Sequence, residues 1–174
     1  TNTFISILGV IKDAASRANK NLGLLDSKRA AAISKASKEV TSNKHDSQFP
    51  IDIFQTGSGT STNMNANEVI ANLASKSSGL EVDPNDHVNM SQSSNDVIPT
   101  AINMSCHYDL EKKLMPNLDE LIKTINFKSK ELKGIIKTGR THLMDAMPID
   151  FGQELSAWEG QLVSAQKELK LITS

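Results

Sequence analysis

Apolar side chains recur at helical spacing through the first part of the chain, and this pattern predicts two helices. The first is expected over about residues 3–19 and the second from Asp26 to about Asn43. Their apolar stripes are formed by Ile5, Leu8, Ile11 and Ala15, and then by Ala30, Ile33, Ala36 and Val40. Asp26 and Ser27 are residue types that commonly begin a helix, so they mark the start of the second one.

A polar, glycine-containing segment separates these helices from a third. Residues 48–63 combine Pro50 with glycines and with many serines, threonines and asparagines, which predicts a loop. Asn65 is followed three positions later by Glu68, a pair that resembles a capping box. The third helix is therefore expected to begin there and to end near Gly79.

A second polar segment covers residues 81–95, and beyond it the pattern is helical almost without interruption to Lys133. Residues 83–86 have the composition of a turn, and residues 93–96 have that of a helix start. Pro116 has no N–H and clashes with the preceding turn, so it is expected to kink or divide the long helix.

One more loop and one more helix complete the pattern. The loop is expected over residues 134–148, and the helix begins near Asp150 and carries Leu155 and Trp158 on one side. Strand signals are short, the best being Ile135-Ile136. The chain is therefore predicted to be all-α, with three polar loops between long helices.

Composition and charge narrow the function. Aromatic residues make up 4% of the chain, so the core must be built from aliphatic side chains. The formal net charge is −1, which makes a nucleic-acid-binding surface a poor expectation but leaves room for a small anionic substrate. Cys106 is the single cysteine, which favours a reducing compartment. No apolar run is long enough to cross a membrane.

The first loop contains a segment that could hold an anion. In Gln55-Thr56-Gly57-Ser58-Gly59-Thr60, glycines expose backbone N–H groups and hydroxyls add further donors. The segment is not a Walker loop, because no lysine follows the second glycine. It is not a nucleophile elbow either, because Thr56 stands where the first glycine is required. An ordinary turn remains the alternative.

Two further segments could carry chemistry. Ser93, Ser94 and Asn95 precede a long helix, whose free N–H groups attract anions, although Asp96 opposes this and plain capping is the alternative. In Gly139-Arg140-Thr141-His142, a hydroxyl lies beside an imidazole that can transfer protons near neutral pH. A lone loop histidine is more often structural. The histidine and cysteine spacing indicates no metal site.

Taken together, these segments resemble the fumarase/aspartase superfamily, and the class II fumarases within it. Nearly the whole chain takes part in the resemblance. The matching motifs are Phe49-Pro50, Gln55 to Thr60, Asn63 to Val69, Asn85-Asp86, Ser91 to Asp96, Gly139 to His142 and Gly152-Gln153-Glu154. The resemblance implies a small N-terminal helical domain with ordered loops over 1–92. It implies the start of a central helical bundle over 93–174.

The resemblance also implies an activity: reversible hydration of fumarate to L-malate in the tricarboxylic acid cycle, without a cofactor, by a homotetramer that binds neither membrane nor nucleic acid. Aspartase-type ammonia lyases carry Gly-Gly-Ala-Gly-Val where this chain has Thr56 to Thr60, and glutamine where it has His142. Such a lyase is the alternative enzyme. A non-catalytic structural protein on the same fold is a third possibility. The compartment would be cytoplasmic, or mitochondrial in a eukaryote.

Residue roles follow from the same resemblance. His142 would join the proton relay and Thr141 would bind substrate. The remaining substrate-binding residues would be Thr56, Ser58, Gly59, Thr60, Ser93, Ser94 and Asn95. An accessory carboxylate site in many fumarases has His-Pro-Asn-Asp where this chain has Asp83, Pro84, Asn85 and Asp86. An acidic residue in place of the imidazole should weaken anion binding, so this site is expected to be altered or absent.

Part of the family's machinery is not found in these residues. The Gly-Ser-Ser-x-Met-Pro-x-Lys-x-Asn loop, which supplies the serine thought to be the base, does not occur in the sequence. The 174 residues are therefore expected to be a fragment that is inactive alone. Its later helices should expose apolar faces and promote self-association.

Overall fold

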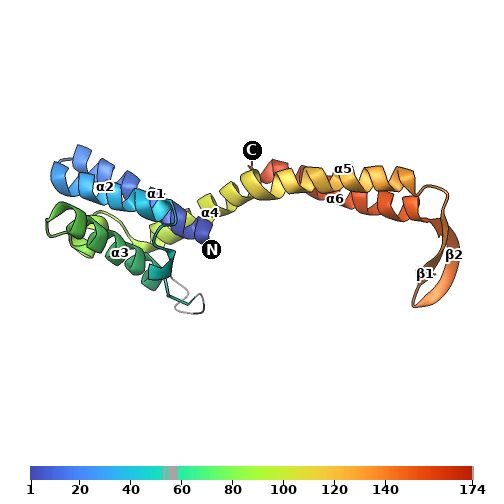
Figure 1. The fold of residues 1–174 in the computed structure, drawn as a ribbon, viewed down its shortest axis with the longest axis horizontal. Helices are drawn as coiled ribbons and strands as arrows, with labels where there is room; N and C mark the ends of the chain where they lie inside the picture. Colours follow the sequence, from blue (N-terminus) through green and yellow to red (C-terminus); the bar gives the residue numbers. More distant parts are fainter. Residues whose placement is uncertain (53, 55–58, 174) are drawn as a thin grey trace. The chain divides into compact units, whose positions relative to one another are not determined.

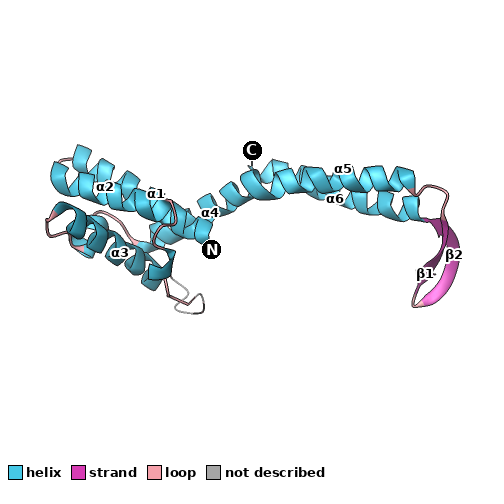
Figure 2. Cartoon of the chain, viewed as in Figure 1, coloured by secondary structure: helices cyan, strands magenta, loops and turns pink. Residues whose placement is uncertain are grey.

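The computed structural model describes residues 1–52, 54 and 59–173. The chain divides into two compact units, Thr1–Cys106 and His107–Ser174. Within the described residues the structure is helical apart from one two-stranded sheet (Figures 1 and 2), which confirms the predicted all-α class.

Three long helices and the start of a fourth build the first unit. They are α1 (Asn2–Asn21), α2 (Ser27–Thr41), α3 (Thr60–Ser78) and α4 (Ser94–Asp109). A 3-10 turn, η1 (Asp46–Gln48), and a π-helical turn, η2 (Pro84–Val88), lie in the connections. Asp26 caps α2 as predicted, because its side chain accepts hydrogen bonds from the N–H groups of Lys28 and Arg29 at 3.0 Å.

Aliphatic side chains from these helices form two packed clusters. Ile33, Val40 and Ile70 lie in one of them, and Leu8 with Val97 and Ala101 lies in the other. Helices α1 and α2 approach closely at Gly9, where an added Cβ would lie 2.7 Å from the carbonyl oxygen of Ser37. The first unit thus has the aliphatic core that the composition required.

The start of α3 differs from the prediction. The helix begins at Thr60, and Asn65 lies inside it as a buried residue whose amide donates to the carbonyl oxygen of Gln48 at 2.9 Å. The Asn65–Glu68 pair is therefore not a capping box. Gly59 and Gly79, both in the left-handed region, bound the helix, so the predicted end at Gly79 is confirmed.

The predicted long helix changes its hydrogen-bond pattern just before Pro116. A π-helical turn, η3 (Leu110–Leu114), separates α4 from α5 (Met115–Glu131), and Pro116 lies in the first turn of α5. Pro116 removes one backbone donor from the helix, while Leu114 and Met115 before it keep right-handed helical backbone angles.

The second unit consists of a helix pair joined through a β-hairpin. Helices α5 and α6 (Phe151–Thr173) pack side by side, and strands β1 (Ile136–Thr141) and β2 (Met144–Asp150) pair antiparallel between them in sequence (Figure 1). The interpretation of residues 134–148 as a loop was therefore wrong.

Polar pairs join the two helices in an antiparallel register. Gln166 donates to Asp119 at 2.6 Å, Asn126 donates to Glu159 at 2.8 Å, and the Ser129 and Ser156 hydroxyls lie 3.0 Å apart. Apolar side chains accompany these pairs: among the described residues of this unit Leu118 is buried, and half-buried ones include Met115, Ile122, Ile125, Leu155, Leu162, Val163 and Leu169.

None of the helices in the described part of the chain is long and apolar enough to cross a membrane.

Candidate active site

The starts of α3 and α4 lie against each other in the first unit. The amide of Asn63, in the first turn of α3, donates to the Ser94 hydroxyl at 2.9 Å. An added Cβ at Gly59 would lie 2.9 Å from the side chain of Ile98, the fifth residue of α4. Glycine is therefore required at this contact for space as well as for its φ of 67°. Sequence segments that were predicted separately as anion sites thus meet in one place.

Donors remain accessible at this junction. Thr60, Ser93 and Asn95 are exposed, and Ser94 is half-buried. The Ser93 hydroxyl oxygen accepts a hydrogen bond from the N–H of Asn95 at 3.2 Å, so it caps α4 while its own proton stays available for donation. Two adjacent helix starts combine their partial positive charges, and this arrangement favours a bound carboxylate.

Two of the predicted substrate-binding residues, Thr56 and Ser58, lie outside the described residues. The described end of that loop is Gly59 and Thr60, which lead directly into α3.

A buried polar network lies beneath the junction, and the sequence interpretation missed it. Lys12 of α1 is fully buried, and its Nζ donates to Asn89 Oδ1 at 3.0 Å and to Gln92 Oε1 at 2.9 Å. Asn89 Oδ1 also accepts from Asn63 at 3.2 Å. A signal was present: Lys12 lies four positions after Leu8, on the apolar stripe of α1 where a charged residue is unexpected.

Thr141 and His142 lie at the tip of the hairpin in the second unit. Thr141 pairs with Met144, which leaves His142 and Leu143 as a two-residue turn with φ angles of 50° and 63°. Positive values at both positions define a type I′ turn, which usually contains Asn-Gly. Both side chains are exposed, and Leu143 is 99% exposed. The turn therefore carries an exposed histidine at the end of the sheet, next in sequence to the exposed Thr141.

The strands below the tip are irregular. Their register shifts between Thr138 and Arg140, and a Cβ added to Gly139 would lie 2.6 Å from the carbonyl oxygen of Met147. Such a bulge increases strand twist and redirects side chains, and bulges are common near active sites. An ion pair between Arg140 and Asp145 at 3.1 Å joins the strands just beyond the bulge.

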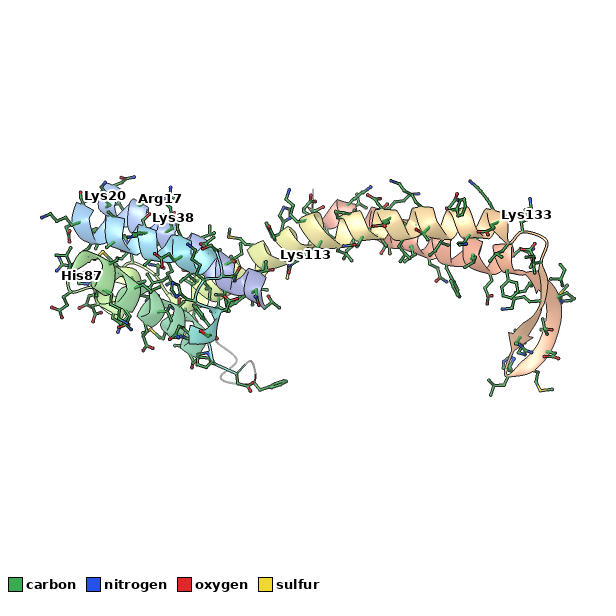
Figure 3. The ribbon with its side chains drawn as sticks, in the orientation of Figure 1. Arg17, Lys20, Lys38, His87, Lys113 and Lys133 are labelled. Carbon is green, nitrogen blue, oxygen red and sulfur yellow. The ribbon has the colours of Figure 1, made fainter. Side chains whose placement is uncertain are left out.

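The segment predicted as an altered accessory site is a capped turn. Asp83 Oδ1 accepts from the N–H groups of Asn85 at 2.7 Å and Asp86 at 2.8 Å. The N–H groups of Asp86 and Asn85 hold the pKa of the Asp83 carboxyl below its usual value. The Asp83 N–H donates to His87 Nδ1 at 2.8 Å, and His87 is labelled on this turn in Figure 3. The turn thus holds a carboxylate of its own on the N–H groups of Asn85 and Asp86.

No group of three or more histidine, cysteine, aspartate or glutamate side chains that could hold a metal ion occurs in the described part of the chain.

Comparisons with known proteins agree with one another. The family model described as lyase matches residues 1–174. A class II fumarate hydratase from Xylella fastidiosa is 52% identical over 166 residues, which are 95% of this chain and 35% of that protein. One from Saccharolobus solfataricus is 51% identical over 151 residues, 87% of this chain and 34% of that protein. The chain thus spans about a third of the length of these relatives.

Solved structures show the same relationship. The class II fumarase from Schistosoma mansoni matches with a TM-score of 0.84 and 44% identity, over 96% of this chain and 36% of that one. A fumarate lyase:delta crystallin from Brucella melitensis matches with a TM-score of 0.88 and 39% identity, over 99% of this chain and 41% of that one.

Proposed function

The chain belongs to the lyase family, and from this premise we propose that the protein that contains it reversibly hydrates fumarate to L-malate. The observation that carries the proposal is the identity of about half of all aligned positions with class II fumarate hydratases, over 95% of this chain. Threonine at positions 56 and 60 and histidine at position 142 favour this activity over the aspartase-type alternative.

The proposed reaction needs donors for a developing negative charge. Removal of a proton from the carbon beside a carboxylate leaves a carbanion-like state, which is stabilised by fixed hydrogen-bond donors near that carboxylate. The junction of α3 and α4 supplies donors of this kind, from Gly59 and Thr60 on one side and from Ser93, Ser94 and Asn95 on the other. We assign Thr56 and Ser58 to the same group by resemblance.

At the hairpin tip, Thr141 is proposed to bind substrate and His142 to take part in the proton relay that handles the water. An exposed imidazole can exchange protons with a bound water near neutral pH. The positive φ of His142 supports a functional role, since backbone strain of this kind gathers at active sites.

The accessory carboxylate site is proposed to be absent. Because Asp83 occupies the N–H groups of Asn85 and Asp86, a second carboxylate there would meet both competition and charge repulsion. Crystals soaked with malate should show no density for it at this turn, and clear density would contradict the proposal.

The complete protein is proposed to be a homotetramer of the tricarboxylic acid cycle, in the cytoplasm or, in a eukaryote, in the mitochondrion. It is proposed to need no cofactor. The 174 residues alone are expected not to hydrate fumarate, because the serine loop of the family is not among them.

The test is a fumarate-hydration assay on the full-length protein, with His142→Asn and His107→Asn compared. Asparagine tolerates positive φ, so the first variant should keep the turn. The second removes an exposed histidine from α4 and serves as the matched control. We expect His142→Asn to lower kcat by roughly 10²-fold or more and His107→Asn to leave it unchanged.

Other outcomes of the same assay would redirect the assignment. Consumption of fumarate that depends on ammonia, without hydration, would move the protein to the aspartase-type lyases. No turnover of either kind by a folded full-length protein would support the non-catalytic alternative.

A further inference from the structure

Lys12 differs from the other cations of α1 by its burial. Its side chain has no exposed surface, whereas Arg17 and Lys20 on the same helix are exposed and extend from the helix surface in Figure 3. Burial of a lysine costs free energy unless its amine is well bonded, and an apolar residue at this position would pack at lower cost. The burial of Lys12 therefore needs an explanation beyond core formation.

The hydrogen bonds of Lys12 all go to one loop, residues 89–92. Its Nζ donates to Asn89 and Gln92, and it forms no ion pair with any described carboxylate. Burial lowers the pKa of this amine to about 7. A neutral amine still has two hydrogens to donate, so both bonds can persist in either protonation state.

Side-chain bonds, rather than regular secondary structure, hold the loop itself. Gln92 Nε2 donates to the carbonyl oxygens of Val88 at 2.9 Å and Met90 at 3.1 Å, and Asn19 of α1 donates to Met90 O at 2.9 Å. Ser91 has a φ of 61°, an uncommon value for a serine. This loop leads directly into Ser93.

The same network reaches the start of α4. Asn63 donates to both Asn89 and Ser94, so Lys12 is connected to the Ser94 hydroxyl through two side chains. Asn63 is fully buried, and its Oδ1 has no hydrogen-bond partner among the described residues. An unpartnered buried acceptor is costly, and it lies within the network that sets the junction of α3 and α4.

We propose that Lys12 is a positioning residue for the carboxylate site at the start of α4. Its hydrogen bonds to Asn89 and Gln92 fix residues 89–92, and this loop places Ser93, Ser94 and Asn95. It does not touch substrate. This proposal rests on the proposed function, because it takes the ligand of that site to be a dicarboxylate.

The test is the affinity of the full-length protein for succinate, a saturated dicarboxylate, by titration calorimetry. Lys12→Met keeps the apolar stem and removes both donors. We expect its Kd for succinate, and its KM for fumarate, to rise at least tenfold. Ile33→Ala, which disturbs the other core cluster, is the control and should lower Tm without changing either constant.

A merely structural role would give a different result. Loss of folded protein lowers apparent kcat and leaves KM and Kd unchanged, so a Lys12→Met variant with succinate affinity within twofold of the parent overturns the proposal. If Lys12→Met does not fold, Asn89→Leu leaves the lysine in place and removes the acceptor it shares with Asn63. Unchanged succinate affinity in that variant has the same meaning.

The two proposals fail in distinguishable ways. A parent protein that binds succinate but does not hydrate fumarate refutes the proposed function while leaving the Lys12 comparison measurable. A parent that binds no dicarboxylate at all refutes both.

Discussion

The two units of the chain bury apolar surface to very different extents. In Thr1–Cys106, side chains such as Leu8, Ile33 and Ile70 have no exposed surface, and they belong to two packed clusters. In His107–Ser174, the buried residues among those described are Leu118, Ser129, Gly152 and Gln166. The first unit therefore contains its own closed core, whereas the apolar side chains along the helix pair of the second unit are mostly half-buried, with polar pairs among them.

Large apolar side chains of the second unit remain on its surface. Phe127 is 66% exposed, Met147 is 78% exposed and Trp158 is 51% exposed. Extended apolar surface of this kind marks contact regions. The stability of the first unit should therefore depend strongly on single apolar side chains of its core. Truncation of an apolar side chain in the second unit should have a smaller effect on stability.

The largest expected effect tests this difference directly. Ile33→Ala in the first unit should lower the free energy of unfolding by about 4 kcal/mol, since it leaves a cavity in a closed core. Leu121→Ala in α5, where the side chain is 47% exposed, should cost less than about 1 kcal/mol. Amide exchange in α2 reports the first unit. Fluorescence of Trp158, the single tryptophan, reports the second. Equal losses of unfolding free energy in the two variants would refute the difference between the units.

A pH series sharpens the comparison within the first unit. The pKa of Lys12 is depressed, so between pH 7 and 10 the unfolded chain holds a proton that the folded chain lacks. Stability should therefore rise with pH over this window, by roughly 3 kcal/mol from the amine alone. The difference in unfolding free energy between the parent and Lys12→Met, measured at both ends of the window, isolates this contribution. A constant difference would show that the amine titrates normally.

A smaller effect is expected at the hairpin tip. Leu143 has a φ of 63°, which is unfavourable for a leucine. Its side chain is 99% exposed, so packing does not offset this strain. Leu143→Gly should relieve this strain and stabilise the second unit by about 1 kcal/mol. Trp158 fluorescence during denaturation is the measurement. Ile135→Gly, an exposed position of the same unit without positive φ, is the control and should give no gain.

The smallest expected effect concerns the capped turn in the first unit. Asp83→Ala should lower Tm slightly at neutral pH because two N–H groups lose their acceptor. The depressed pKa of Asp83 means that its contribution is present above the ordinary aspartate pKa and is lost as pH falls through the lower, folded-state value. Melting curves of parent and variant should therefore converge in acid, and a gap that persists there would contradict the assignment.

Local signals allowed most helices to be predicted, because periodicity and capping act within a few residues. The start at Asp26 and the end at Gly79 are examples. The start of α3 was misplaced because Asn65 has the chemistry of a cap, yet its amide bonds to Gln48 across the fold. The hairpin was missed because its strands do not alternate polar and apolar residues, and its turn uses His142 and Leu143 in place of Asn-Gly.

The candidate site shows the same division. The loops at Gly59 and Ser93 could be found as separate donor-rich segments, but their contact depends on pairs more than thirty positions apart. Asn63 bonds to Ser94, and Gly59 lies against Ile98. The role of Lys12 could not be predicted, since its acceptors lie 77 and 80 positions away. Long-range polar contacts leave almost no local pattern.

The three polar pairs between α5 and α6 also fix how far one helix is shifted along the other. Asp119–Gln166, Asn126–Glu159 and Ser129–Ser156 share one register, so any sliding of one helix along the other would break all of them together. Side chains on facing helices can re-pair only after a shift of about one turn, roughly 5.4 Å. The polar pairs therefore fix the register of the two helices, and with it the position at which the hairpin and its tip, with His142, leave the helix pair.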